Sequence, residues 1–362
     1  MTSLDDLPIR DDLRGLTPYG APQEHVRIQL NVNENTHPIP EEVATDIVTA
    51  LAKAVLDVNR YPDREFTELR ESLARYLGHG LGPENIWAAN GSNEVLQQTL
   101  QAFGGPGRSV LGFPPTYSMH SIIASGTGTR WVTAERDPDY AISPETVVAA
   151  IQREKPDIVF LCSPNNPTGT GLSLETIAAA YDATEGILLV DEAYAEFADG
   201  DTALTLLPGR PRLLVSRTMS KAFAFAGARL GYLAADPAVT DALRLVRLPY
   251  HLSAFTQAAA VAALAHAPAM LAMVDNIKGQ RDRMITELSA LGFTPVPSEA
   301  NFVLFGGVTD PHAVFEALLK HDIIIRDVGI PNHLRVTAGS DWETSAFLEA
   351  LGRIAAADRI AQ

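Results

Sequence analysis

The sequence predicts an α/β protein that has a large domain with a mainly parallel sheet and a smaller α/β domain beside it. In the middle of the chain, short apolar runs alternate with helical patterns, which is typical of parallel strands joined by crossover helices. A second alternation of helix and strand occupies the last third. The chain has 362 residues, of which 46% are hydrophobic, so there is enough apolar material for two cores.

The large sheet is predicted from four apolar runs, each bounded by turn residues. We expect strands within residues 156–164, 186–194, 212–218 and 229–236. Residues 173–183 have a helical pattern and would cross over between the first two of these strands.

Two further helices are expected in this domain. The segment NGSNEVLQQTLQAFGG, residues 90–105, has an amphipathic run with Ser92 and Asn93 as candidate N-terminal caps. The apolar run at 258–274 is interrupted by His266 and Pro268 and is short for a membrane span, so we interpret it as a buried core helix.

The last third predicts a smaller unit made of helices and strands in turn. Helices are expected at 280–293 and at the start of 311–329, and strands at 301–307, at the end of 311–329 and at 333–339. We divide the chain into an N-terminal arm (1–30), a large domain (61–264) and a small domain (31–60 with 265–362).

Composition excludes several classes of function. The net charge of −16 argues against a nucleic-acid surface, which needs a basic face. The single cysteine, Cys162, excludes an internal disulfide framework and a multi-cysteine zinc site, and no other metal site is expected. The acidic first 15 residues lack the apolar segment of a signal peptide. We therefore expect a cytoplasmic protein that binds no membrane.

The residues with chemical potential follow the predicted strands, where the loops of an open α/β sheet bind ligands. Lys221 lies among small and apolar residues in VSRTMSKAFAFAGARLGYL, and a desolvated lysine becomes a nucleophile for carbonyl carbons. Thr218, Ser220 and Arg229 are donors that suit a phosphate group. Pyridoxal 5'-phosphate (PLP) carries both an aldehyde and a phosphate, and it fits this set.

Two neighbouring strand ends add polar residues. Asp191 follows the apolar run GILLV and needs a partner; it is either a helix cap, an ion-pair member or the carboxylate that keeps a PLP ring nitrogen protonated. Tyr194 could return to the same ligand. Asn166 lies in the turn-rich stretch SPNNPTG, which is either an ordinary turn or a ligand loop.

Other segments add candidates for anions and rings. The GSNE element at 91–94 is a helix N-terminus, either simply capped or an anion site. Tyr117, in FPPTYSMH, is either a core residue or a flat face for a cofactor ring. Arg326 and Arg335 each follow apolar strand residues, where they form structural ion pairs or bind a substrate carboxylate or phosphate.

Taken together, SPNNPTG, VDEAY, SRTMSKAFAFAGARLGY and LRVTAG resemble the fold-type I PLP-dependent aminotransferases along nearly the whole chain. PYGAP, LNVNEN, NRYPD, AANGSNE, PPTYSMH and IIIRDVGIP resemble the histidinol-phosphate aminotransferase family of actinobacteria. Compared with better-known members, the segment RDVGIPNHLR between the last two arginines is compact.

The resemblance implies a role for each candidate. Lys221 would attach PLP and then move the proton during transfer. The cofactor-binding residues would be Ser92, Asn93, Tyr117, Asn166, Asp191, Tyr194, Thr218, Ser220 and Arg229. Tyr61 would reach the PLP phosphate of the neighbouring subunit, so the family's homodimer is part of the site. The substrate-binding residues would be Tyr19, Asn33, Arg326 and Arg335.

The reaction implied by the resemblance moves an amino group from L-glutamate to imidazole acetol phosphate and yields L-histidinol phosphate, a step of histidine biosynthesis. An aromatic amino acid aminotransferase is the main alternative, because the same scaffold with another pocket lining would accept phenylpyruvate. A phosphothreonine-type decarboxylase is more distant. A transcription regulator would need a DNA-binding domain for which residues 1–60 offer no room. A nucleotide-dependent oxidoreductase would need a Gly-rich fingerprint, which is absent.

Overall fold

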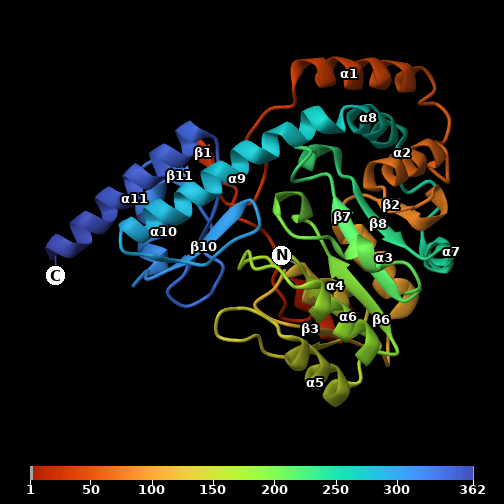
Figure 1. The fold of residues 1–362 in the computed structure, drawn as a ribbon, viewed down its shortest axis with the longest axis horizontal. Helices are drawn as coiled ribbons and strands as arrows, with labels where there is room; N and C mark the ends of the chain where they lie inside the picture. The colour runs from red at the N-terminus through yellow and green to blue at the C-terminus, as the bar shows by residue number, and fades with distance from the viewer. Residues whose placement is uncertain (1–2, 362) are drawn as a thin grey trace.

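The structure, a computed structural model, describes residues 3–361. Two α/β parts lie side by side, each with its own sheet. The long helix α9 (Ala267–Ala290) runs from one part to the other, as Figure 1 shows.

The larger part is built on a seven-stranded sheet with the order β2-β8-β7-β6-β5-β3-β4. Neighbouring strands from β7 to β4 are parallel, whereas β8 is antiparallel to both β7 and β2. The mainly parallel sheet and its four predicted strands are thus confirmed. The strands are β2 (Ile86–Ala89), β3 (Ser109–Gly112), β4 (Arg130–Thr133), β5 (Ile158–Cys162), β6 (Ile187–Asp191), β7 (Leu213–Thr218) and β8 (Gly231–Ala235).

The direction of β8 follows from its connection to β7. A parallel strand needs a crossover of a dozen or more residues, usually through a helix. Residues 219–230 form only a short 3-10 turn, Ala226–Ala228, so the chain returns beside β7 in the opposite direction. This short return keeps Lys221 and Arg229 at the end of the sheet where β7 finishes.

Helices cover both faces of this sheet, which explains why its central strands are buried on both sides. These helices are α2 (Thr67–Leu77), α3 (Ser92–Phe103), α4 (Met119–Gly126), α5 (Pro144–Glu154), α6 (Leu174–Ala183), α7 (Pro237–Val246) and α8 (Ala254–Ala265).

Two predictions about helices in this part were wrong in detail. The N-terminal cap of α3 is Gly91, whose φ of 86° suits glycine, and Ser92 and Asn93 lie inside the first turn without capping it. The single core helix predicted at 258–274 is two helices, α8 and α9, because the chain breaks at His266.

No helix among residues 3–361 is by itself long and apolar enough to cross a membrane. The pair α8 and α9 passes that test only jointly, and its two members are bent by 77° at the break.

The smaller part contains a three-stranded antiparallel sheet of order β12-β10-β9 and the parallel pair β1 and β11. The helix predicted at 280–293 is the second half of α9, and the other predicted helix and strands are found. The elements are β1 (Ile28–Gln29), β9 (Thr294–Pro295), β10 (Phe302–Gly306), β11 (Ile323–Ile324), β12 (Leu334–Thr337), α10 (Pro311–Leu319) and α11 (Asp341–Ala361).

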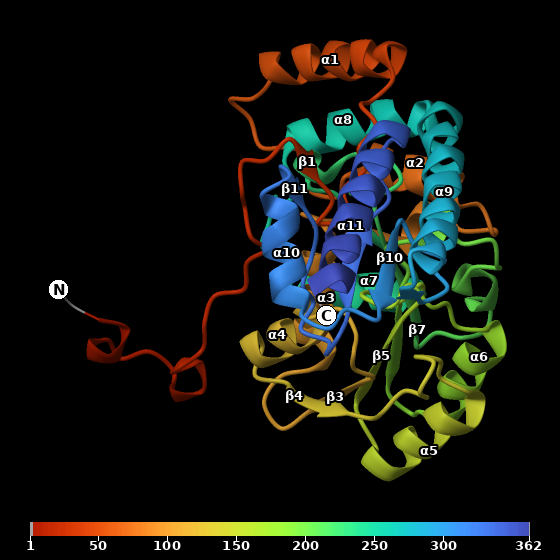
Figure 2. The same ribbon diagram turned by 90° about the vertical axis from the view of Figure 1, so that its left-hand side faces the viewer.

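The helix α1 (Glu41–Leu56) packs against α8 of the larger part. It lies above α8 in both views (Figures 1 and 2). The division of the chain into arm, small domain and large domain stays a prediction.

The N-terminal segment projects from the body of the molecule, as Figure 2 shows. It forms two 3-10 turns, Leu4–Asp6 and Asp11–Leu13, and then runs extended until β1 pairs with β11. This pairing fixes the following residues, 31–34, beside the carboxyl end of the large sheet, where they line a cavity.

Candidate active site

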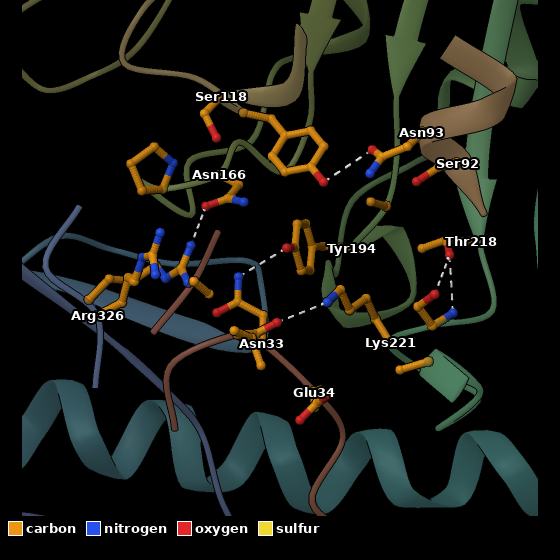
Figure 3. A pocket seen from close by; sticks show the side chains of 18 of the residues that line it. Asn33, Glu34, Ser92, Asn93, Ser118, Asn166, Tyr194, Thr218, Lys221 and Arg326 are labelled. Carbon is orange, nitrogen blue, oxygen red and sulfur yellow. Dashed lines mark hydrogen bonds between the residues drawn. The ribbon is translucent and has the colours of Figure 1, made fainter. Parts of the chain in front are cut away.

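A cavity of about 590 Å³ lies where the ends of β5, β6 and β7 meet the small part. Every predicted site residue except Tyr61 lines it, although the residues come from the arm, the large sheet and the C-terminal region. Figure 3 shows how those that it labels point inward from different elements, among them Asn33, Asn166 and Lys221. The predicted residues in the lining are Tyr19, Asn33, Ser92, Asn93, Tyr117, Asn166, Asp191, Tyr194, Thr218, Ser220, Lys221, Arg229, Arg326 and Arg335.

Lys221 offers the nucleophile of this cavity. Its amine donates a hydrogen bond to the Val32 carbonyl at 3.1 Å. Burial, aided by the positive charges of Arg335 and Arg229, lowers the pKa of Lys221 to about 8. By contrast, burial raises the pKa of the Cys162 thiol, which therefore stays protonated. The amine is thus the better nucleophile in this site at neutral pH.

Asp191 ends β6 and is almost fully buried. One of its carboxylate oxygens lies 3.1 Å from Nε2 of the buried His120, and the other accepts a hydrogen bond from the Ser216 hydroxyl at 3.2 Å. Asp191 is therefore held by two buried side chains, and it does not cap a helix, because the 3-10 turn that follows has Tyr194 at its N-terminal cap. The carboxylate remains in the lining of the cavity, where it can face a positive charge on a ligand.

The N-terminus of α3 approaches Arg229 very closely. A Cβ added to Gly91 would lie 2.4 Å from the Arg229 guanidinium, so a side chain here would displace the arginine. Arg229 itself has a left-handed backbone with φ of 56°, which is uncommon for a residue other than glycine and costs energy. Free amides at a helix N-terminus beside a guanidinium form an anion site.

The same region is closed by β8 and by the end of β7. A Cβ on Gly231 would lie 2.1 Å from the Ser92 amide nitrogen, so only glycine lets β8 pass this close to α3. The Thr218 hydroxyl lies 3.0 Å from the Ser220 hydroxyl and accepts the Ser220 amide at 3.1 Å. Hydroxyls, helix amides and Arg229 therefore converge on one side of the cavity.

The Asn33 side chain connects the segment after β1 to both parts of the molecule. Its amide nitrogen donates to the Tyr194 hydroxyl at 3.0 Å, and its side-chain oxygen accepts from Thr337 at 3.1 Å. Burial raises the pKa of Tyr194, which stays a neutral hydroxyl. Asn33 also has a left-handed φ of 57°, and its carbonyl accepts a hydrogen bond from Asn301.

Arg326 and Arg335 face each other across an antiparallel bridge. Arg335 donates to Asn166 Oδ1 at 2.6 Å and to the Asn31 carbonyl at 2.8 Å. Burial lowers its pKa to about 10, which leaves it charged at neutral pH. Within residues 3–361, neither Nη1 of Arg326 nor Nε of Arg335 has a hydrogen-bond partner, although both are buried. Such donors suit a carboxylate or phosphate.

The two remaining predicted tyrosines have different positions. Tyr117 lines the cavity, and its hydroxyl donates to Asn93 at 3.1 Å; burial raises its pKa to about 12. Tyr61 lies outside the cavity, is 80% exposed and stacks on Tyr250 with ring centroids 4.4 Å apart. Its exposure leaves the side chain accessible to another molecule.

Several residues of this site were not predicted from the sequence, and His120, Glu34 and Ser118 are examples. His120 contacts Asp191, and its signal was its place three residues after Tyr117 in PPTYSMH. Glu34 and Ser118 line the cavity and directly follow Asn33 and Tyr117. Their neighbours were the only sequence signal for them, because serines and glutamates are common on any surface.

The donor set fits a phosphate-bearing aldehyde such as PLP. Gly91 and Gly231 let the start of α3 lie close to Arg229 and to β8. The cradle that results is lined by hydroxyls, amides and a guanidinium, which suit the phosphate. A lysine of lowered pKa suits the aldehyde, and a buried carboxylate suits the ring nitrogen. Arg326 lies apart from this cradle, on the opposite side of Lys221 (Figure 3), and its bridge partner Arg335 has an unpartnered donor as well, so the pair suits a second anion.

Comparison with known proteins shows the family of the chain. Residues 26–352 match the family described as aminotransferase class I and II. The chain is 64% identical over 353 residues to a histidinol-phosphate aminotransferase of Paenarthrobacter aurescens, which covers 96% of this chain and 95% of that protein. A histidinol-phosphate aminotransferase of Thermobifida fusca is 56% identical over 351 residues and covers 96% of each chain.

A solved structure gives the same result for the fold. The crystal structure of histidinol-phosphate aminotransferase from Sinorhizobium meliloti in complex with pyridoxal-5'-phosphate superposes with a TM-score of 0.83 at 28% sequence identity, covering 92% of each chain. The family resemblance and the fold class predicted from the sequence are therefore confirmed.

Proposed function

The chain belongs to the class I and II aminotransferases, and we propose that it catalyses the reaction of the histidinol-phosphate aminotransferases with PLP as its cofactor. An amino group moves from L-glutamate to imidazole acetol phosphate, and the products are 2-oxoglutarate and L-histidinol phosphate. The observation that carries this proposal is the position of the Lys221 amine, which lies between two separate anion-binding regions of one cavity.

The cofactor would be held by the large sheet and its loops. Its phosphate would lie against Ser92, Asn93, Thr218, Ser220 and Arg229. When bound, PLP supplies an aldehyde for an amine and a protonated ring that withdraws electrons from the substrate carbon.

The other cofactor contacts would come from four side chains. Asp191, supported by His120 and Ser216, would hold the proton on the ring nitrogen. Asn166 and Tyr194 would contact the ring's oxygen, and Tyr117 would provide the flat face beside the ring.

Lys221 would perform two tasks in this reaction. With a pKa of about 8, roughly a tenth of its amines are neutral at pH 7 and can attack a carbonyl carbon. Once displaced from that carbon by the substrate amine, the same neutral amine would take the proton from the substrate carbon.

The substrates would be bound on the side of the small part. Arg335, assisted by Arg326, would bind the carboxylate of glutamate in one half-reaction and the phosphate of the second substrate in the other. Tyr19, on the arm, and Asn33, just after it, would cover the bound substrate.

We also propose that two copies of this chain form a homodimer with shared active sites. Tyr61 and Tyr250, which stack on each other, belong to segments with several exposed apolar side chains, and such side chains mark interaction surfaces. They belong to the end of α1 and the loop after it, the end of α7 and the loop after it, and the start of α8: Val55, Leu56, Val58, Leu245, Leu248, Tyr250 and Phe255. Tyr61 of the partner subunit would then contact the PLP phosphate.

The single, buried and free Cys162 is consistent with a cytoplasmic location.

The choice of substrate is tested by rival amino donors. With 2-oxoglutarate as acceptor, kcat/KM is measured for L-histidinol phosphate and for L-phenylalanine. We expect a preference for histidinol phosphate of at least about 100-fold, since its phosphate carries more charge and more acceptor oxygens for the arginine pair than the single carboxylate of phenylalanine. A higher kcat/KM for phenylalanine would overturn the proposal in favour of an aromatic amino acid aminotransferase.

A further inference from the structure

A buried ion pair lies directly behind the cofactor-binding ends of β6 and β7. Successive residues of a strand point to opposite faces of the sheet. Asp191 and Thr218 line the cavity, whereas their neighbours Glu192 and Arg217 do not. Both neighbours are buried, with 4% and 8% of their surfaces exposed.

Each of the three nitrogens of the Arg217 guanidinium has a hydrogen-bond partner. Its Nε and Nη2 donate to one carboxylate oxygen of Glu192 at 3.0 and 2.8 Å. Its Nη2 also donates to the Thr202 hydroxyl, and its Nη1 lies 3.4 Å from Glu196. The other oxygen of Glu192 accepts the Ala203 amide at 2.6 Å, so the pair has one well-defined geometry.

The same network reaches the turn that carries Lys221. The Tyr76 hydroxyl donates to Glu196 at 3.2 Å, and its ring packs edge-on against Phe223 with centroids 5.2 Å apart. Phe223 lies two residues after Lys221. The network therefore touches the sequence neighbours of Asp191, Thr218 and Lys221 at once.

Stability alone does not account for a pair of this kind. Two charges removed from water lose hydration, and well-packed apolar residues of similar volume often stabilise a protein as well or better. What a forked guanidinium adds is a fixed distance and angle between the two strands that it joins.

We propose that Arg217 is a positioning residue for the cofactor. By binding Glu192, it fixes the separation of the ends of β6 and β7. Asp191, Thr218 and Lys221 can then contact the same cofactor molecule. The proposal deepens the proposed function and rests on it, because it takes the roles of these three residues in PLP binding as given.

The test measures PLP binding by the cofactor-free protein, together with thermal unfolding. The first variant is Arg217→Lys, which keeps the charge but loses the fork, and the matched control is Arg212→Lys at the other end of β7. Arg212 donates to the carbonyls of Thr184 and Gly186, far from the cavity. Both variants lose arginine hydrogen bonds on the same strand.

We expect Arg217→Lys to raise the Kd for PLP by about tenfold or more, as is usual when the supporting partners of ligand side chains are lost. It should also shift the pH midpoint of the absorption of bound PLP, because Asp191 and Lys221 no longer hold their relative positions. Arg212→Lys should lower the Tm and leave the Kd and the pH midpoint unchanged.

A triple variant separates positioning from stability. Arg217→Met with Glu192→Met, made together with Glu196→Gln, removes all the buried charges of the network, so the cofactor-free protein should unfold near the wild-type Tm. Its Kd for PLP should remain raised like that of Arg217→Lys. A wild-type Kd and pH midpoint in Arg217→Lys, or in the folded triple variant, would overturn the inference. If the wild-type protein itself took up no PLP, the proposed function would fail first, and the two failures are therefore distinguishable.

Discussion

On the side of the large sheet, the cavity is formed by Asp191 and Thr218 at the ends of adjacent strands and by Lys221 just beyond. On the opposite side, Asn33 bonds to Thr337, a residue 304 positions away, and Arg335 bonds to Asn166 across 169 positions. The first side is held by one sheet, whereas the second exists only where the arm and the small part pack on the large one.

We call the first side the sheet half and the second side the assembled half. Because they are held together differently, the two halves should respond to mutation in different ways. Changes in the sheet half should affect the cofactor and the chemical step. Changes in the assembled half should affect the binding of substrates more than the binding of the cofactor. Four predictions test this contrast.

The largest effect is expected from Lys221→Ala, which removes both the nucleophile and the proton carrier of the sheet half. Transamination should fall by at least about 10³-fold. The absorption band of lysine-bound PLP should be lost, measured beside Lys320→Ala, an exposed lysine of the small part. Normal turnover by Lys221→Ala would refute the assignment of the whole site.

The second prediction concerns the energetic cost of burying this amine. The pKa of Lys221 is about 8 in the folded protein and near 10.5 in the unfolded chain. Between these pH values the unfolded state binds more protons, so the free energy of unfolding rises with pH. The cost is fully present below pH 8 and is lost as the pH rises towards 10.5.

Lys221→Met removes this cost. In urea unfolding of the cofactor-free protein at pH 7, the variant should be more stable than the wild type by about 2 kcal/mol, a value discounted for the solvent that enters the cavity. The difference should shrink towards zero at pH 10.5. A wild type that is more stable than Lys221→Met at pH 7 would contradict the expected cost of burying the amine.

The assembled half is tested by Arg335→Lys, which keeps the charge and loses the fork. The KM for glutamate should rise by about 10- to 100-fold, since a bidentate contact with the carboxylate is lost. Because Arg335 also donates to Asn166, which would contact the cofactor ring, the Kd for PLP should rise too, but by less than the KM, up to about tenfold. An equal rise of both constants would show that the two halves are not separate.

The smallest effect is expected from Tyr61→Phe, which removes one hydroxyl from the proposed dimer contact. The Kd for PLP should rise by about tenfold, the value of a hydrogen bond to a charged group. Hybrids of Tyr61→Phe and Lys221→Ala subunits should bind PLP at one site with wild-type affinity, because that site takes Lys221 and Tyr61 from different chains. Weak binding at every site of the hybrid would place Tyr61 in its own subunit's site.

Much of the fold was predictable because its signals are local. The apolar runs that became β5, β6 and β7 are buried on both faces of the sheet, and a run of this kind ending in a polar residue places that residue at the sheet's edge. The break at His266 was not predictable in the same way, since the alanine-rich sequence favours helix on both sides and tertiary packing decides where it bends.

The same contrast holds for the site. Asp191, Thr218, Lys221 and Asn166 were found because each follows an apolar strand in a recognisable motif. His120 and Glu34 were missed because their importance comes from what they face in space. The cap of α3 was predicted wrongly for a related reason: Ser92 and Asn93 are good caps by composition, but Gly91 is required where α3 approaches Arg229.

The sequence by itself determined the family, the order of strands and helices, and the candidate cofactor-binding residues, because these depend on motifs and periodicities within a few residues of each other. Tertiary structure alone decided which side chains share the cavity, that Asn33 connects Tyr194 to Thr337, and that Arg217 and Glu192 lie behind Asp191 and Thr218. Those relations join residues far apart in the chain. Strand pairing within the large sheet brings Arg217 to Glu192, and packing of the small part on the large one brings Thr337 to Asn33 and Tyr194.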